Sequence, residues 1–475
     1  MAGLRGSVSA VLPGDSLQDF LDQAADMGGS RVDNYTLYQD FYDGKRGALL
    51  RDRAREYLER TSVPFCENFC DVAVDTLAER LRVVGFSSSE SADDHDPVGR
   101  TVEGWWRANR MDGLQVVAHT QALMKGDEFV IVEWDDARGI PRFCRQHQHQ
   151  VKMVYSDDEQ DTIEYAVKGW NTRKRAAQNV SGRSIRRLNL YFPDRVEKWF
   201  RPDSGGGGGG WEQWQDPGDE VWPVWWTDTR TEDGDPLGVP VVHIRHRPLG
   251  SGYGRSRIRM AIPFQLELNK YAADLNDLID NHALPQDWVT GVTGDTSYKR
   301  VAGNLWQATG ENARFGRLEA TPTSNLLEAI EGVLSRLARR MRIPMHLLTG
   351  GTPPSGESLK TAESGLVATA KACQVEFGNA WEDATMIALR LEAAFGDGPD
   401  LPDDLSVEAQ WANPEARSDE ADLRAATLKK ELGVSKHTLL TELGYDPEKE
   451  AEVRSGEAEE AQAAFGKFLG GPADE

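Results

Sequence analysis

The chain has 475 residues, with 54 lysines and arginines against 77 aspartates and glutamates, so its formal net charge at neutral pH is −23. A polypeptide of this length can bury a sizeable core and is long enough for about three domains. The acidity argues against a protein that holds nucleic acid by general charge attraction, because such binding needs lysine and arginine to replace the counterions along the phosphates. The composition therefore predicts a globular protein that repels DNA on average.

Cysteine content and hydropathy indicate a protein that is made and kept in water. Four cysteines are too few for a disulfide framework in a chain of this size, so we expect all of them (Cys66, Cys70, Cys144 and Cys373) to be reduced in a cytoplasmic protein. No stretch approaches the ~20 apolar residues of a membrane span. Residues 1–12 lack the apolar run of a secretory signal. We therefore expect no membrane partner.

The N-terminal part of the chain, up to residue 125, is predicted to be mostly helical. A helix is expected after Pro64, where apolar residues recur at helical spacing from Phe65 to Leu81 and the pattern stops near Gly85. Another is expected over residues 112–125, ending at Gly126.

From Glu128 the apolar period changes to two residues, which is typical of strands. A run of six glycines, 205–210, is too permissive in its backbone angles to hold a fixed site and is predicted to be a loop tip. The pattern indicates a mainly antiparallel β region inserted among helices, with strands over 129–134, 142–147, 151–155, 163–170, 187–192, 196–201 and 239–244.

Helices are predicted again after Gly254. One apolar stripe covers residues 264–278, and a second helix begins with Ser324 or Asn325 as its cap and ends before Pro344. The residues between them, 284–323, mix short β-like pieces with turns. A longer stripe runs from 358 to 394, with bends expected at its internal glycines, and the segment after residue 401 has 18 acidic and 8 basic residues and is predicted to form short helices.

Residues 351–358 approach the spacing of a nucleotide-binding phosphate loop, except that Glu357 stands where that loop has its lysine. The lysine supplies the positive charge that reaches the phosphates, whereas a carboxylate repels them. No apolar strand precedes the segment, and Pro353 and Pro354 stiffen it. We therefore interpret it as a structural or positional loop.

The sequence gives only weak evidence for other catalytic or metal-binding sites. Cys144, His147 and His149 suggest a zinc site, but no fourth ligand or second Cys/His pair is nearby, so a half-exposed strand is the simpler interpretation. Serine, histidine and aspartate are abundant without a nucleophile-elbow signature. The sequence predicts no catalytic residue, no metal and no cofactor.

Residues 166–189 form the one basic stretch and contain no acidic residue. Two interpretations remain open: a solvated hairpin tip, or a contact with nucleic acid or an acidic partner protein. The 14 tryptophans cluster in the β region, where they are expected to anchor a core or a subunit contact. The candidate residues of the basic patch are Lys168, Arg173, Lys174, Arg175, Arg183, Arg186 and Arg187.

The order of these elements, together with several short segments, resembles the portal proteins of tailed bacteriophages. The likeness is closest to the portal family of siphophages that infect Gram-positive hosts, with an actinobacterial phage as the expected source. No single motif is diagnostic, but the ordered set is. It consists of residues 42–44 (YDG), 68–81 (NFCDVAVDTLAERL), 125–132 (KGDEFVIV), 343–350 (IPMHLLTG) and 355–363 (SGESLKTAE).

The resemblance implies an α+β portal fold assembled as a ring. Residues 1–257 would form a mixed helix and antiparallel-sheet wing, 258–283 and 324–343 two stem helices, and 284–323 a small α/β clip. Residues 344–357 would form the tunnel loop, 358–396 a long kinked wing helix, and 397–475 the crown and acidic tail. Packing within the stem would involve Leu268, Leu275, Leu327, Ile330, Leu334 and Leu337.

The resemblance also implies function. Portals are not enzymes; they form a dodecamer at one capsid vertex through which double-stranded DNA is packaged and ejected. The implied partners are the terminase large subunit, the major capsid and scaffolding proteins and a head-tail adaptor. The protein would occur in the virion and, during assembly, in the host cytoplasm. Thr349, Thr352, Ser355 and Glu357 would face the DNA. The alternative, a nucleotide-binding DNA-processing enzyme, is opposed by the missing lysine.

Overall fold

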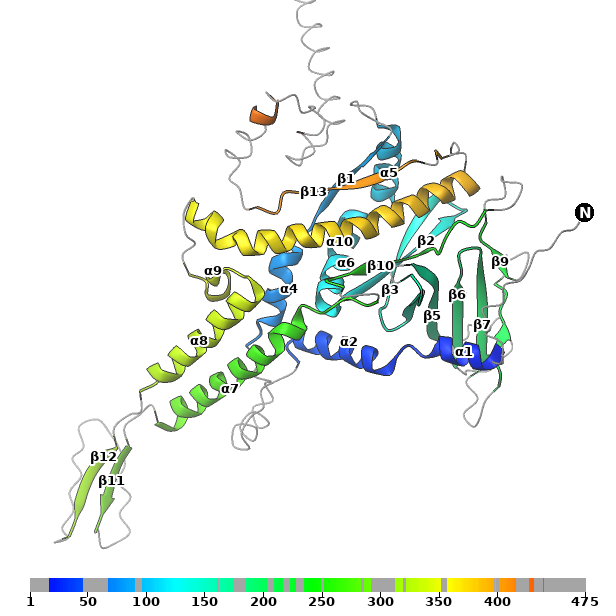
Figure 1. Ribbon diagram of the computed structural model, residues 1–475. Helices are drawn as coiled ribbons and strands as arrows, with labels where there is room; N and C mark the ends of the chain where they lie inside the picture. The colour runs from blue at the N-terminus through cyan, green and yellow to red at the C-terminus, as the bar shows by residue number, and fades with distance from the viewer. Residues whose placement is uncertain are drawn as a thin grey trace, which may run out of the picture. The chain divides into compact units, whose positions relative to one another are not determined.

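The computed structural model divides the chain into two compact units (Figure 1). The first comprises residues 1–39, 73–259 and 353–475, and the second comprises residues 40–72 and 260–352. Helices and antiparallel sheets are both present, which confirms the α+β class. The residues that the structure describes are 17–45, 67–89, 96–159, 162–173, 184–202, 209–216, 223–227, 235–248, 252–282, 286–291, 312–318, 322–351, 357–396, 398, 401–402, 404–415, 427–430 and 439.

Antiparallel sheets form the middle of the first unit. A three-stranded sheet has β2 (Asp127–Asp135) between β3 (Ile140–Gln146) and β10 (Val241–Arg245). A six-stranded sheet follows, in the order β4 (Val151–Tyr155), β5 (Ile163–Arg173), β6 (Ser184–Tyr191), β7 (Arg195–Pro202) and β8 (Glu212–Gln213), with β9 (Val224–Trp225) also paired to β7. The predicted antiparallel β region is therefore confirmed.

Strand alternation sends neighbouring residues of β5 into two different cores. Val167 packs with Leu188 and with Leu21 of helix α1 (Leu17–Ala25). Ala166 points to the opposite face and packs with Phe129 and other residues of the three-stranded sheet. Because successive side chains of a strand point to opposite faces, a period of two produces both contacts.

The long helix α10 (Glu357–Phe395) crosses this unit and packs against β10, β2 and β13 (Val407–Trp411) (Figure 1). It is continuous through Gly365 and Gly378. A Cβ atom on Gly378 would lie 3.3 Å from the indole nitrogen of Trp411, so this glycine lets β13 approach closely. The predicted stripe is buried from Leu366 to Leu391, whereas Leu359 is half-buried and Ala362 exposed. Its buried members are Leu366, Ala370, Cys373, Phe377, Trp381, Ala384, Ala388 and Leu391.

The smaller helices follow the sequence pattern in part. Helix α2 covers Gly29–Tyr42, and α6 (Met111–Lys125) ends at Gly126, whose φ of 100° stops the helix as predicted. The helix expected to start near Phe65 is described as α4 (Cys70–Ala78), and residues 46–66 lie outside the described residues. The pattern did not predict helix α5 (Pro97–Ala108), which Asp96 caps by accepting a hydrogen bond from Gly99 N.

The sequence pattern also did not predict one pair of strands. β1 (Val83–Ser88) pairs with β13, near the other end of the chain. The local pattern predicts the end of a helix near β1, because its strand partner lies too far along the sequence for a local pattern to reveal. β13 itself lies in a region predicted to be helical.

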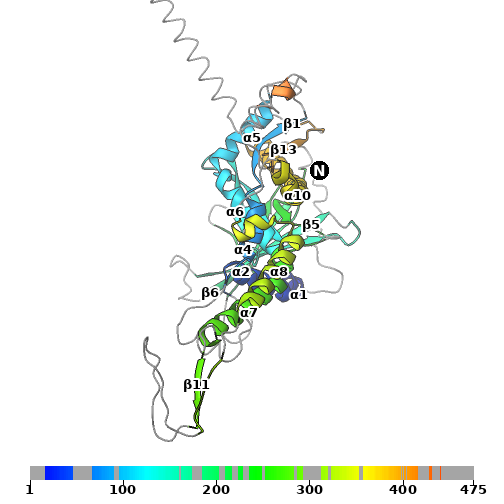
Figure 2. The same cartoon turned by 90° about the vertical axis from the view of Figure 1, so that its left-hand side faces the viewer.

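In the second unit, α7 (Ile258–His282) and α8 (Ser324–Met341) lie side by side (Figure 1 and Figure 2). A hairpin of β11 (Gln286–Thr290) and β12 (Arg314–Leu318) connects them, and the short helix α9 (Met345–Thr349) follows α8. The N-cap of α8 is Thr323, one residue before the predicted cap, and it makes no side-chain cap hydrogen bond. No helix among the described residues is long and apolar enough to cross a membrane.

Candidate functional site

Burial of the apolar side chains of α7 and α8 decreases toward the hairpin. At the opposite end of the pair, Leu268, Leu334 and Leu337 are buried, with Leu337 only 1% exposed. Leu275 and Ile330 lie further along and are half-buried. Leu327, in the first turn of α8, is 47% exposed, and Ile279 near the end of α7 is 46% exposed. The apolar stripes of these helices thus continue beyond the region in which they are buried.

Charges are distributed unevenly along the same pair. Arg336 of α8 donates to Glu267 of α7 over 2.8 Å, which ties the two helices together. Nearer the hairpin, α8 exposes Glu328 and Glu331, whereas its last turn exposes Arg339 and Arg340. The arginines lie at the C-terminal end of α8, where the helix dipole favours positive charge.

The hairpin exposes large apolar side chains. Trp288 of β11 lies directly over Gly316 of β12, where a Cβ atom would come within 2.3 Å of the indole, so only glycine fits. Trp288 is 40% exposed, Phe315 45% and Leu318 57%. Arg317 and Asp287 form an ion pair of 2.7 Å across the strands. Single exposed apolar residues are ordinary, but a group on one small hairpin is a mark of a contact surface.

Of the four residues expected to face DNA, one is described with its side chain. Thr349 ends α9, is exposed, and donates its hydroxyl hydrogen to the Met345 carbonyl over 3.1 Å. Gly350 follows with a φ of 64°, so the chain turns sharply there. Thr352 and Ser355 lie outside the described residues, and Glu357 is described only as the first residue of α10.

Two arginines of the predicted basic patch make contacts inside the first unit. Arg186 donates to the Ala25 carbonyl over 2.6 Å. Arg187 is only 8% exposed and lies 3.9 Å from the centre of the Trp214 ring and 5.4 Å from that of Trp170. The residues Lys174, Arg175 and Arg183 lie outside the described residues, as does the side chain of Arg173.

The cysteine and histidines that suggested zinc point to different partners. The Cys144 thiol lies 3.3 Å from a Glu133 carboxylate oxygen, and burial raises its pKa to about 11. His149 lies 3.2 Å from the Thr36 hydroxyl, while His147 is exposed. Across the described part of the chain, no three His, Cys, Asp or Glu side chains gather as a metal site.

A buried polar network centred on Asp127 was not predicted from the sequence. Asp127 accepts hydrogen bonds of 2.6 Å from the Tyr35 hydroxyl and 2.6 Å from the Gly254 amide, and it lies 2.8 Å from His243 Nε2. The Tyr155 hydroxyl lies 2.7 Å from the other nitrogen of His243. Burial lowers the pKa of His243, while Asp127 acts in the opposite direction. The network joins α2, β2, β4 and β10, so its role is to position these elements.

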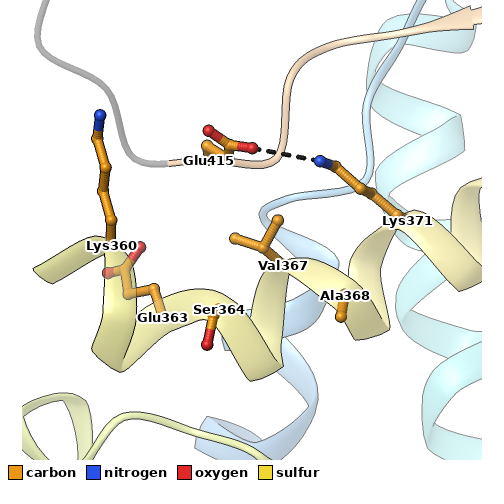
Figure 3. A pocket seen from close by; sticks show the side chains of 7 residues that line it. All are labelled: Lys360, Glu363, Ser364, Val367, Ala368, Lys371 and Glu415. Atoms are coloured by element: carbon orange, nitrogen blue, oxygen red, sulfur yellow. Dashed lines mark hydrogen bonds and ion pairs between the residues drawn. The ribbon is translucent and has the colours of Figure 1, made fainter. Parts of the chain in front are cut away.

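A groove of about 300 Å³ lies along the first turns of α10 (Figure 3). Two ion pairs lie along it: Lys371 contacts Glu415 at 3.2 Å, and buried Glu363 contacts Arg80 at 3.1 Å. The first pair joins the segment after β13 to α10, and the second joins α10 to the segment between α4 and β1. The groove is lined by Lys360, Glu363, Ser364, Val367, Ala368, Lys371 and Glu415.

Comparison with known proteins identifies the family. The family model described as "Phage portal protein, SPP1 Gp6-like" matches residues 26–464, which is most of the chain. The chain belongs to this portal family. It is 24% identical over 469 residues to the portal protein of Mycobacterium phage L5, covering 96% of this chain and 90% of that protein. It is 25% identical over 419 residues to the portal protein of Mycobacterium phage D29, covering 83% and 79%.

Membership in the portal family confirms the expectation drawn from the order of segments. Portal proteins are structural and not enzymatic, which agrees with Glu357 in place of the phosphate-loop lysine. The match spans both compact units, so the family covers the helix pair and hairpin as well as the sheets.

Proposed function

We propose that this chain assembles into a dodecameric ring at one capsid vertex and that double-stranded DNA passes through the ring during packaging and ejection. The observation that carries the proposal is the family match over residues 26–464. The incomplete burial of the α7 and α8 stripes supports it, because Leu327 and Ile279 need a cover that a neighbouring copy can supply. In this proposal α7 and α8 are the stem, and residues 284–323, including the β11–β12 hairpin, are the clip.

The remaining segments take the roles expected of a portal. Residues 1–257 and 358–396 form the wing, residues 344–357 the tunnel loop, and residues 397–475 the crown and tail. The DNA-facing candidates are Thr349, Thr352, Ser355 and Glu357. A net charge of −23 per chain suits a channel in which DNA slides, because repulsion between phosphate and carboxylate prevents a deeply bound state.

A ring that does not itself hydrolyse ATP needs other proteins to drive the DNA through it and to complete the capsid vertex. We propose that a separate terminase supplies the ATP-driven motor, that capsid and scaffolding proteins surround the ring, and that a head-tail adaptor closes it. The protein would then be a virion component that is assembled in the host cytoplasm.

Packaging of DNA by assembled particles tests this proposal. Proheads that contain the chain, mixed with terminase, ATP and DNA, should protect DNA from nuclease, and proheads assembled without it should protect none. Equal protection in both preparations would contradict the proposal. A melting temperature of the purified chain that rises with ATP and Mg²⁺ would instead support a nucleotide-binding protein, since a ligand that binds the native state raises its apparent stability.

A further inference from the structure

One face of the six-stranded sheet is only partly covered. In β5, β6 and β7, the residues that point to this face near one end of the strands (Ala166, Tyr191 and Val196) pack on the three-stranded sheet. Further along the same strands the face continues with cationic, aromatic and amide side chains. We call this second part the Trp170 face; it consists of Lys168, Trp170, Arg187, Asn189, Lys198 and Phe200.

The Trp170 face is built around stacked cations. Arg187 lies opposite Trp170 in the strand register and is stacked between the rings of Trp170 and Trp214, and the Lys168 ammonium lies 5.0 Å from the centre of the Trp170 ring. Phe200 packs edge-on against Trp214 at 5.4 Å. Trp170, Trp214, Lys168 and Phe200 all remain half-buried rather than buried, so solvent reaches this face.

The cations and the Trp214 indole together bind a carboxylate, and in this structure the carboxylate is the chain's own Asp216. Asp216 accepts a hydrogen bond of 2.5 Å from Trp214 Nε1 and lies 3.0 Å from Lys198 Nζ and 3.6 Å from Arg187. Burial alone would raise the pKa of Asp216, but the hydrogen bonds from Trp214 and Lys198 lower it. The geometry therefore already recognises an acidic side chain.

A second observation points to a ligand that carries N–H donors. The side-chain oxygen of Asn189, buried on the same face, has no hydrogen-bond donor among the described residues. A buried acceptor without a donor is costly, and a peptide N–H can satisfy it. A phosphate backbone offers acceptors but no such donor.

We propose that the Trp170 face is a docking site for an acidic peptide segment of a partner protein. Charge complementarity supports this occupant, since Lys168, Arg187 and Lys198 bring three cations together on this face. Aromatic rings beside the cations supply apolar contact for the peptide, and interfaces are typically enriched in tryptophan and arginine. Duplex DNA is the weaker occupant, because its phosphate backbone carries no N–H donor for the Asn189 oxygen.

Fluorescence anisotropy with the full chain tests the docking site. The probe is a fluorescein-labelled synthetic peptide of Glu, Ala and Leu, and the competitor is an unlabelled DNA duplex of matched net charge. We expect the wild-type chain to bind the peptide with an affinity that falls as salt rises. Lys168→Glu should weaken binding roughly fivefold, whereas Arg100→Glu, a matched reversal at an exposed arginine of α5, should leave binding unchanged.

Asp216→Asn gives the more discriminating result. The amide oxygen can still accept from Trp214, but the internal negative charge that competes with the peptide is gone, so peptide affinity should rise roughly threefold. Unchanged or weaker binding by a folded Asp216→Asn chain would show that the cluster serves only internal packing. Equal loss in Lys168→Glu and Arg100→Glu, or stronger binding of the duplex than of the peptide, would also overturn the proposal. None of these readouts needs ring assembly, so they fail or succeed independently of the proposed portal function.

Discussion

At the scale of single residues, the first unit depends on close contacts between distant segments. Gly126 ends α6 with a positive φ. The backbone at Gly126 lies so close to the backbone of Gly254 that a side chain would not fit between them. His119 of α6 lies 3.0 Å from the Leu81 carbonyl through Nδ1 and accepts the Trp381 indole hydrogen at Nε2 over 2.9 Å. His119 is completely buried, and it is therefore held in one neutral tautomer.

Gly126→Ala should destabilise the chain by more than about 2 kcal/mol. The new Cβ atom would lie 2.8 Å from the Gly254 backbone, and alanine disfavours a φ of 100°. Urea unfolding measures the loss. Gly113→Ala is the control, because nothing lies within 4 Å of that position in the same helix, and it should be neutral or slightly stabilising. Equal midpoints for the two variants would contradict this packing.

Acidification should weaken the fold through His119. Burial lowers its pKa from 6.5 to about 4, so between these values the unfolded chain binds a proton that the folded chain refuses. Stability is therefore fully present above pH 6.5 and falls as the pH drops toward 4, by about 3 kcal/mol for this residue.

His119→Gln isolates that contribution. Burial raises the pKa of Glu128 to about 7, which acts in the opposite direction, so the difference between wild type and variant carries the prediction rather than either profile alone. We expect the unfolding free energy of wild type to fall more steeply than that of His119→Gln between pH 6.5 and 4. Parallel profiles would contradict a neutral, buried His119.

At the scale of elements, the leucines of helix α8 differ in how far they are buried. Leu334 is 7% exposed and packs within its own chain, whereas Leu327 is 47% exposed. The sequence predicted the whole stripe but not this division, since helical spacing identifies an apolar face without showing how far along the helix a partner covers it.

Leu327→Asp should leave the single chain folded and prevent ring assembly. The exposed position costs the folded chain little, but a carboxylate there cannot be buried against a neighbouring copy. Leu334→Asp is the contrast, because it places the charge inside the pair and should lower the melting temperature. Analytical ultracentrifugation measures ring assembly, and thermal melting measures the stability of the folded chain. Intact rings of Leu327→Asp would remove this face of α8 from the subunit contact.

Glu357→Lys tests the loop before α10. If Glu357 faces the channel, the substitution places a ring of positive charges beside the DNA, and each phosphate contact adds salt-sensitive affinity. We expect rings that assemble normally but package DNA more slowly, with the defect easing as salt rises. Packaging at the wild-type rate in low salt would remove Glu357 from the channel lining.

Local patterns predicted the elements whose burial repeats along one segment. The stripe from Leu366 to Leu391 in α10 and the alternating strands after Glu128 are confirmed because each residue's environment follows its own periodicity. β1 and the Asp127 network were missed because their partners, β13, Tyr35 and His243, come from distant segments. No local signal separates a buried aspartate at the start of a strand from an exposed one.

At the scale of the whole molecule, three features support a ring: a family match over residues 26–464, a strongly acidic chain, and a helix pair with a hairpin whose apolar side chains are incompletely covered. In a closed ring each copy contacts the next copy through the same face. The exposed apolar side chains of the helix pair and hairpin can therefore be buried on every subunit of the ring. A single chain leaves it open to water.

Electron microscopy of the purified full-length chain tests ring assembly itself. We expect closed rings with a central opening, and class averages viewed along the axis should show a rotational symmetry that every subunit shares. The same preparation of Leu327→Asp should contain single chains. A wild-type preparation that remains monomeric, or forms only open filaments without a central opening, would contradict ring assembly.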